Sequence, residues 1–149
     1  MTLYARLCAL VHDDARAPKQ RLQDAIEAIH EARPRHQFTG LYVVCSDALE
    51  LAAFAGPPTE HTRIPIGRGL CGRAVRDRRD LDIADVNAEP EYLACSLTTK
   101  SEAIALVWLR GEVVGQIDID SDTPGAFGAD AMQSLSTMAH ILAPLVAQI

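Results

Sequence analysis

Residues 103–120 read AIALVWLRGEVVGQIDID, and they carry the clearest evidence for the fold class. Two apolar, β-branched runs, 103–109 and 112–120, flank Arg110-Gly111, which is a hairpin signal. Their apolar density favours two neighbouring strands at the centre of a sheet. Upstream, FTGLYVVC (38–45) and ALELAAF (48–54) flank the turn residues Ser46-Asp47 and predict a second hairpin. An antiparallel sheet is therefore expected.

The segment between the hairpins predicts one helix, one strand and a long loop. The glycines of RIPIGRG (63–69) predict a tight turn. The next segment, LCGRAVRDRR (70–79), has helical character, with Cys71 in the first helical turn. LDIADV (81–86) is expected to form a short strand. Residues 87–101 are polar and without sustained periodicity, so we expect a loop over the sheet, and loops of this length are usually functional or disordered.

Helices are predicted at both ends of the chain. Apolar residues recur at helical spacing around Leu3–Val11, again from Leu22 to Ile29, and from Met132 to Ile149. Cys8 lies in the first of these stripes and is expected to be a small buried apolar side chain. The fold class is therefore α+β, a single domain spanning residues 1–149 with its terminal helices packed on one face of the sheet.

Composition excludes several classes of function. The 149 residues are 48% hydrophobic and 23% charged, with a net charge of −6, so an ordinary folded domain is expected and nucleic acid is not an expected partner. No signal peptide or membrane span is predicted, which favours the cytoplasm and reduced thiols. The four cysteines lack zinc-finger spacing, so neither a metal site nor another cofactor is predicted.

Acidic residues are the candidate chemistry of the central strands. Asp118 and Asp120 are two positions apart on a strand, so their side chains share a face and lie roughly 7 Å apart. Pairing through Arg110-Gly111 would bring Glu102 to the same end. The three carboxylates form either a solvated edge or a pocket that binds an ammonium group or holds a neutral, proton-donating acid.

A cysteine stands close to these acids in the sequence. Cys95 lies in the loop immediately before Glu102, so a loop folded over the sheet would hold its thiol above the acidic face. Neighbouring carboxylates raise a thiol pKa, unless a ligand cation or a helix N-terminus compensates. A reactive Cys95 therefore needs such help.

Several of these motifs together resemble a known family. RIPIGRGLCGRAV (63–75), YLACS (92–96), KSE (100–102) and GQIDIDSDTPGAF (115–127) resemble the GAF-domain enzymes that reduce free methionine-(R)-sulfoxide. FTGLY (38–42) is similar to a pocket-lining segment of that family. The resemblance runs from Phe38 to about the end of the chain.

The resemblance implies a role for each matching residue. Cys95 would attack the sulfoxide sulfur, the three acids would hold the amino acid and polarise the S–O bond, and Phe38 and Tyr42 would line the pocket. The resulting sulfenic acid would be resolved to a disulfide, which thioredoxin reduces. Cys71 matches a further family cysteine and is either the resolving thiol or a packed helical residue.

The sequence also departs from the family pattern. His61 occupies the position of the usual resolving cysteine, and Ser96 replaces the acid that normally follows the reactive cysteine. A non-catalytic GAF module that binds small molecules or senses redox state therefore remains an alternative to the enzyme. The long apolar stripes of the terminal helices favour a homodimer.

Overall fold

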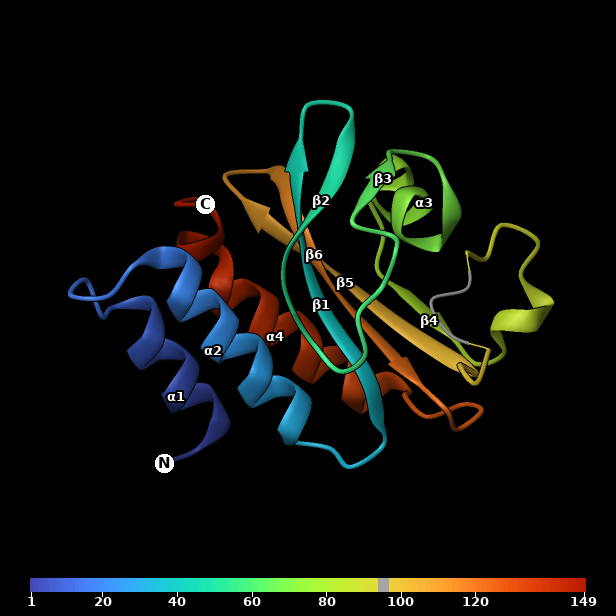
Figure 1. The fold of residues 1–149 in the computed structure, drawn as a ribbon, viewed down its shortest axis with the longest axis horizontal. Helices are drawn as coiled ribbons and strands as arrows, with labels where there is room; N and C mark the ends of the chain where they lie inside the picture. Colours follow the sequence, from blue (N-terminus) through green and yellow to red (C-terminus); the bar gives the residue numbers. More distant parts are fainter. Residues whose placement is uncertain (94–96) are drawn as a thin grey trace.

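The computed structural model describes residues 1–93 and 97–149 (Figure 1). In chain order the elements are α1 (Leu3–Val11), α2 (Pro18–Glu31), β1 (His36–Cys45), β2 (Ala48–Ala55), β3 (Arg63–Pro65), α3 (Gly69–Asp77), β4 (Leu81–Ile83), the 3-10 turn η1 (Val86–Ala88), β5 (Ser101–Leu109), β6 (Glu112–Ser121) and α4 (Ala129–Val146).

The strands form a six-stranded antiparallel sheet in the order β3-β2-β1-β6-β5-β4. Both predicted hairpins are confirmed. Arg110 and Gly111 have φ of 53° and 79°, as the tight β5-β6 connection requires, and Ser46 has φ of 59° at the β1-β2 turn. The acidic strand β6 lies between β1 and β5, so its central position is also confirmed.

Helices α2 and α4 cover one face of the sheet, α1 packs against both of them on the same side, and α3 lies against the other face (Figure 1). The stripe of α2 that the spacing predicted, including Leu22, Ile26 and Ile29, is fully buried against the sheet. Burying each such side chain stabilises the fold by about 1.5–3 kcal/mol. The expected α+β arrangement, with terminal helices on one face, is therefore confirmed.

One local prediction is wrong and another is right only in part. Cys8 is exposed, because the buried side of α1 carries Leu7 and Val11 and Cys8 falls outside that narrow stripe. The strand expected over 81–86 ends at Ile83. Asp85 then accepts a hydrogen bond from the Asn87 amide at 3.0 Å and caps η1, which turns the chain away from the sheet.

None of the helices in the described ranges 1–93 and 97–149 is both long enough and apolar enough to cross a bilayer.

Gly72 lets the first turn of α3 pack directly on the chain that precedes it. A Cβ atom at this position would lie 2.5 Å from the Pro65 carbonyl oxygen and 2.9 Å from the Gly67 amide nitrogen. Both contacts are with backbone, so they cannot be relieved by rotating a side chain. The absence of a side chain at Gly72 therefore allows the first turn of α3 to lie directly on residues 65–67.

We expect Gly72→Ala to lower the free energy of unfolding by about 1–3 kcal/mol, because the added methyl overpacks this contact. Urea denaturation followed by circular dichroism measures the change. Arg76→Ala in the same helix is the control, since exposed Arg76 bonds to its neighbour Asp77, and its effect should stay within about 0.5 kcal/mol. Equal stability of the Gly72→Ala and wild-type proteins would contradict this account.

Candidate functional site

The three acids lie on the sheet face opposite α1, α2 and α4. Glu102 on β5 is directly paired with Asp120 on β6, and Asp118 lies two residues before Asp120 on the same face. Their exposed fractions are 3% for Glu102 and 1% for each aspartate. The solvated-edge interpretation is therefore wrong, and the predicted convergence of these strand ends is confirmed.

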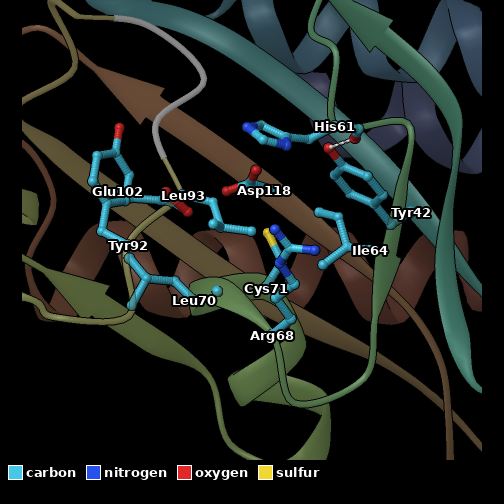
Figure 2. Close-up of a pocket in the computed structure, with 11 residues that line it drawn as sticks. Tyr42, His61, Ile64, Arg68, Leu70, Cys71, Tyr92, Leu93, Glu102 and Asp118 are labelled. Atoms are coloured by element: carbon cyan, nitrogen blue, oxygen red, sulfur yellow. Dashed lines mark hydrogen bonds between the residues drawn. The ribbon is translucent and has the colours of Figure 1, made fainter.

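Helix α3 brings a thiol to these acids. Gln116, another residue on this face of β6, donates a hydrogen bond from Nε2 to the Cys71 carbonyl at 2.9 Å. This bond fixes the first turn of α3 over the sheet. The candidate ligand atoms of Cys71, Glu102 and Asp118 all lie within 4.8 Å of one another, and Figure 2 shows these side chains converging.

A small pocket surrounds this cluster. The cavity volume is about 10 Å³, which is close to the space that holds one water molecule. Its walls come from β1, the segment leading to β3, the first turn of α3, the segment before residue 94, and the acidic strands. The lining residues are Tyr42, His61, Ile64, Arg68, Gly69, Leu70, Cys71, Tyr92, Leu93, Glu102 and Asp118.

Tyr42 orders one wall of this pocket. Its hydroxyl donates a hydrogen bond to the His61 carbonyl at 2.8 Å and so holds the segment before β3 near the sheet (Figure 2). Arg68, the residue that precedes α3, lies at the rim, where its side chain is exposed. The pocket therefore combines buried acids with a guanidinium at its edge.

Burial dominates the electrostatics of Asp118. Desolvation raises the pKa of its carboxyl to about 6, while hydrogen bonds with Glu102 and Cys71 partly oppose this rise. Asp118 therefore holds a proton over part of the near-neutral range. Carboxyl groups with such raised pKa values serve as proton donors in many enzymes.

The predicted site residues divide into three groups. Cys71, Glu102, Asp118 and Tyr42 line the pocket. Asp120 and Phe38 are paired across β6 and β1 on the same face, outside the lining, and the Phe38 ring stacks on Phe54 at 6.1 Å. Cys95, with Ala94 and Ser96, lies outside the described residues.

Sequence reasoning missed several pocket residues. No sequence pattern marked four of the lining residues as part of a pocket, although each lies in or beside a motif described above. These residues are Ile64, Arg68, Tyr92 and Leu93. Gln116 did carry a signal, because the Q-x-D-x-D alternation places it on the same face as both aspartates.

Comparisons with known proteins agree with this architecture. A free methionine-R-sulfoxide reductase from Escherichia coli is 32% identical over 110 residues, covering 74% of this chain and 66% of that protein. The chain thus matches slightly less than two thirds of the length of this relative.

Two solved structures are also similar. A type II free methionine-R-sulfoxide reductase from Thermoplasma acidophilum is 39% identical, with a TM-score of 0.84 over 87% of this chain and 92% of that one. The free methionine-R-sulfoxide reductase from Neisseria meningitidis, in complex with its substrate, is 30% identical, with a TM-score of 0.89 over 98% and 87%. These relatives are oxidoreductases.

The model of the GAF domain matches residues 8–144, which is nearly the whole chain and contains every lining residue of the pocket. The chain therefore belongs to the GAF domain family.

Proposed function

We propose that this protein reduces free methionine-(R)-sulfoxide to methionine, with Cys95 as the nucleophile. The observation that carries the proposal is the buried cluster of Cys71, Glu102 and Asp118 in one pocket, where burial raises the pKa of the Asp118 carboxyl to about 6 and so makes it easier to protonate. Reduction of a sulfoxide needs a proton donor for the departing oxygen. The reductase relatives from three organisms support the same substrate.

In the proposed reaction the Cys95 thiolate attacks the sulfoxide sulfur while the acid pair of Glu102 and Asp118 protonates the sulfoxide oxygen. Attack forms a bond between the Cys95 sulfur and the substrate sulfur. The protonated oxygen then transfers to the Cys95 sulfur while the S–O bond of the substrate and the new S–S bond both break, so that methionine leaves and Cys95 remains as a sulfenic acid. The sulfur of the substrate is thereby reduced and the sulfur of Cys95 is oxidised. A second thiol then displaces water and forms a disulfide.

Cys71 is the candidate for that second thiol. Of the cysteines in the described residues, it alone lines the pocket, whereas Cys8 is exposed on α1 and Cys45 ends β1. His61 lines the pocket at the position where relatives of this pattern carry a resolving cysteine. Thioredoxin is the proposed reductant of the resulting disulfide.

The charges of the pocket suit a free amino acid. Buried carboxylates complement an ammonium group, and the exposed guanidinium of Arg68 at the rim complements a carboxylate. Because the cavity of about 10 Å³ is too small for methionine sulfoxide, we expect the half-buried side chains of Tyr92 and Leu93 to move when it binds.

We expect Arg68→Ala to weaken binding of free methionine sulfoxide by about tenfold, the lower end for a charge-assisted hydrogen bond, because Arg68 is exposed. Isothermal titration calorimetry measures the change. Methionine sulfoxide amide is the matched control, since it lacks the carboxylate and should bind the wild-type and variant proteins equally. An equal loss for both ligands would show that Arg68 does not bind the carboxylate.

The activity is tested by single turnover. Wild-type protein, reduced, freed of reductant and mixed with free methionine-(R)-sulfoxide, should release up to about one methionine per chain, because each attack consumes one thiol. The S epimer and peptide-bound sulfoxide should release none. Binding of an amino acid without any methionine release would instead favour the alternative, a non-catalytic small-molecule or redox-sensing GAF module.

A homodimer is also proposed, with the terminal helices at its interface. A cavity of about 400 Å³ opens between α1, α2 and α4, where the apolar side chains of Leu3, Tyr4 and Met138 lie beside polar ones such as Arg33 and Ser134. Apolar surface of this kind favours burial against another chain. Light scattering at micromolar concentration should give twice the mass of the chain, and a monomer mass would contradict the proposal.

A further inference from the structure

We infer that Cys71, Glu102 and Asp118 form a binding site for a single Zn²⁺ ion, which blocks the pocket. The spacing of the cysteines predicts no such site, because its ligands come from three separate elements, α3, β5 and β6. Zinc binding itself stands on the geometry alone. The inhibition that follows from it rests on the proposed function of the same pocket.

The ligand atoms are close enough to share one ion. All three lie within 4.8 Å of one another, and the ligands of a tetrahedral Zn²⁺ lie about 3.3–3.6 Å apart. Small side-chain rotations therefore bring the thiolate sulfur and two carboxylate oxygens to bonding distance. The cavity of about 10 Å³ between them leaves room for an ion or a single water molecule.

One of the two Asp118 carboxyl oxygens, Oδ1, provides a second sign of a missing partner, although the carboxyl group also forms hydrogen bonds with Glu102 and Cys71. Asp118 is 1% exposed, and its Oδ1 atom accepts no hydrogen bond from any part of the chain that the structure describes. A buried polar atom without a partner is costly, so such atoms in native structures usually contact water, an ion or a ligand. Figure 2 shows the Asp118 carboxylate among the pocket residues, beside the Glu102 carboxylate and near the Cys71 sulfur.

The donor set selects the metal. Zn²⁺ accepts both thiolate and carboxylate ligands, whereas Mg²⁺ and Ca²⁺ prefer oxygen ligands alone. One thiolate and two carboxylates bring three negative charges, which leaves one negative charge after Zn²⁺ binds. The guanidinium of Arg68 at the rim opposes that residual charge. Water is the natural fourth ligand, as in zinc sites that keep an open position.

Zinc and the amino-acid substrate would compete for the same groups. The carboxylates proposed to hold the substrate ammonium are the metal ligands, so both cannot be bound at once. The Cys71 thiol would also be held as a metal-bound thiolate and be withdrawn from disulfide formation. Zinc binding would therefore be a reversible inhibitory state of the proposed reductase.

Cobalt(II) titration of the reduced full-length protein tests the site directly, because a thiolate-to-cobalt charge-transfer band reports a cysteine ligand. The parent protein carries Cys8→Ser and Cys45→Ser, which remove the exposed and half-exposed thiols. The parent should show this band at one equivalent of cobalt, and zinc should displace it. Adding Cys71→Ser should abolish the band, and persistence of the band would overturn the proposal.

Glu102→Gln and Asp118→Asn test the oxygen ligands while conserving shape. Each substitution should weaken zinc binding by more than about tenfold, because even the loss of a residue that only hydrogen-bonds to a metal ligand lowers metal affinity by about that factor. Circular dichroism confirms that each variant is folded, and unchanged zinc affinity in both folded variants would overturn the proposal.

A separate measurement addresses the competition. Zinc should weaken binding of methionine sulfoxide to the parent protein, and simultaneous binding of both would show that the ion lies elsewhere. A protein that binds zinc and releases no methionine contradicts only the proposed function. One that releases methionine and shows no cobalt band contradicts only the zinc site.

Discussion

Cys95→Ser is expected to release no methionine from free methionine-(R)-sulfoxide in a single turnover, because the serine hydroxyl does not replace the thiolate as nucleophile at neutral pH. The effect should be complete. Calorimetry should still detect ligand binding, since Glu102, Asp118 and Arg68 remain in place. Methionine release is quantified by chromatography after mixing reduced protein and sulfoxide without reductant.

Cys71→Ser is the informative counterpart. It should keep the single-turnover release of methionine and lose steady-state turnover with thioredoxin, because resolution follows the first attack. Cys8→Ser and Cys45→Ser should retain both, since neither residue lines the pocket. Should Cys95→Ser release methionine as the wild type does while Cys71→Ser does not, the two thiols would have exchanged their proposed roles.

Asp118→Asn is expected to stabilise the fold above pH 6, although it removes a ligand-binding group. Burial raises the pKa of this carboxyl from 3.8 to about 6. At neutral pH the folded protein therefore holds a buried carboxylate whose ionisation costs at most about 3 kcal/mol relative to the unfolded chain. Asparagine has nearly the same shape and carries no charge.

The sign of the pH dependence follows from the direction of this shift. Between about pH 4 and pH 6 the folded state keeps a proton that the unfolded state releases, so the contribution of Asp118 to stability is lost as pH rises. The groups that face Asp118 are Glu102 on β5, Cys71 on α3, and His61, Arg68 and Tyr92 in the pocket wall.

Urea denaturation of the wild-type and Asp118→Asn proteins between about pH 4 and pH 7 measures the free energy of unfolding of each. The difference between the two values isolates Asp118, because groups far from it titrate in the same way in both proteins. The variant should gain up to about 3 kcal/mol relative to the wild type as pH rises through the window. A difference that is constant with pH would show that Asp118 has an ordinary pKa. Glu50→Gln, on an exposed strand position, is the control and should show no comparable gain.

The sheet and its acidic face could be predicted from local sequence patterns. Strand periodicity is a local property, so the alternation in QIDID already placed Asp118 and Asp120 together and Ile117 and Ile119 on the opposite face. The hairpin turns are equally local, because Arg110-Gly111 and Ser46 adopt the positive φ that such turns need. These features were therefore predictable before any packing was known.

Which side chains meet in the pocket depends on how the elements pack, and local sequence patterns do not show it. The bond from Gln116 to the Cys71 carbonyl spans 45 positions of the chain, and no pattern of spacing predicts such a contact. The wrong prediction that Cys8 is buried has the same origin. An apolar stripe shows which residues of a helix can be buried, but the packing of the helix determines which of them are buried. The raised pKa of Asp118 likewise depends on α3 and β5 excluding water from β6, which is a property of assembled elements and not of any one segment.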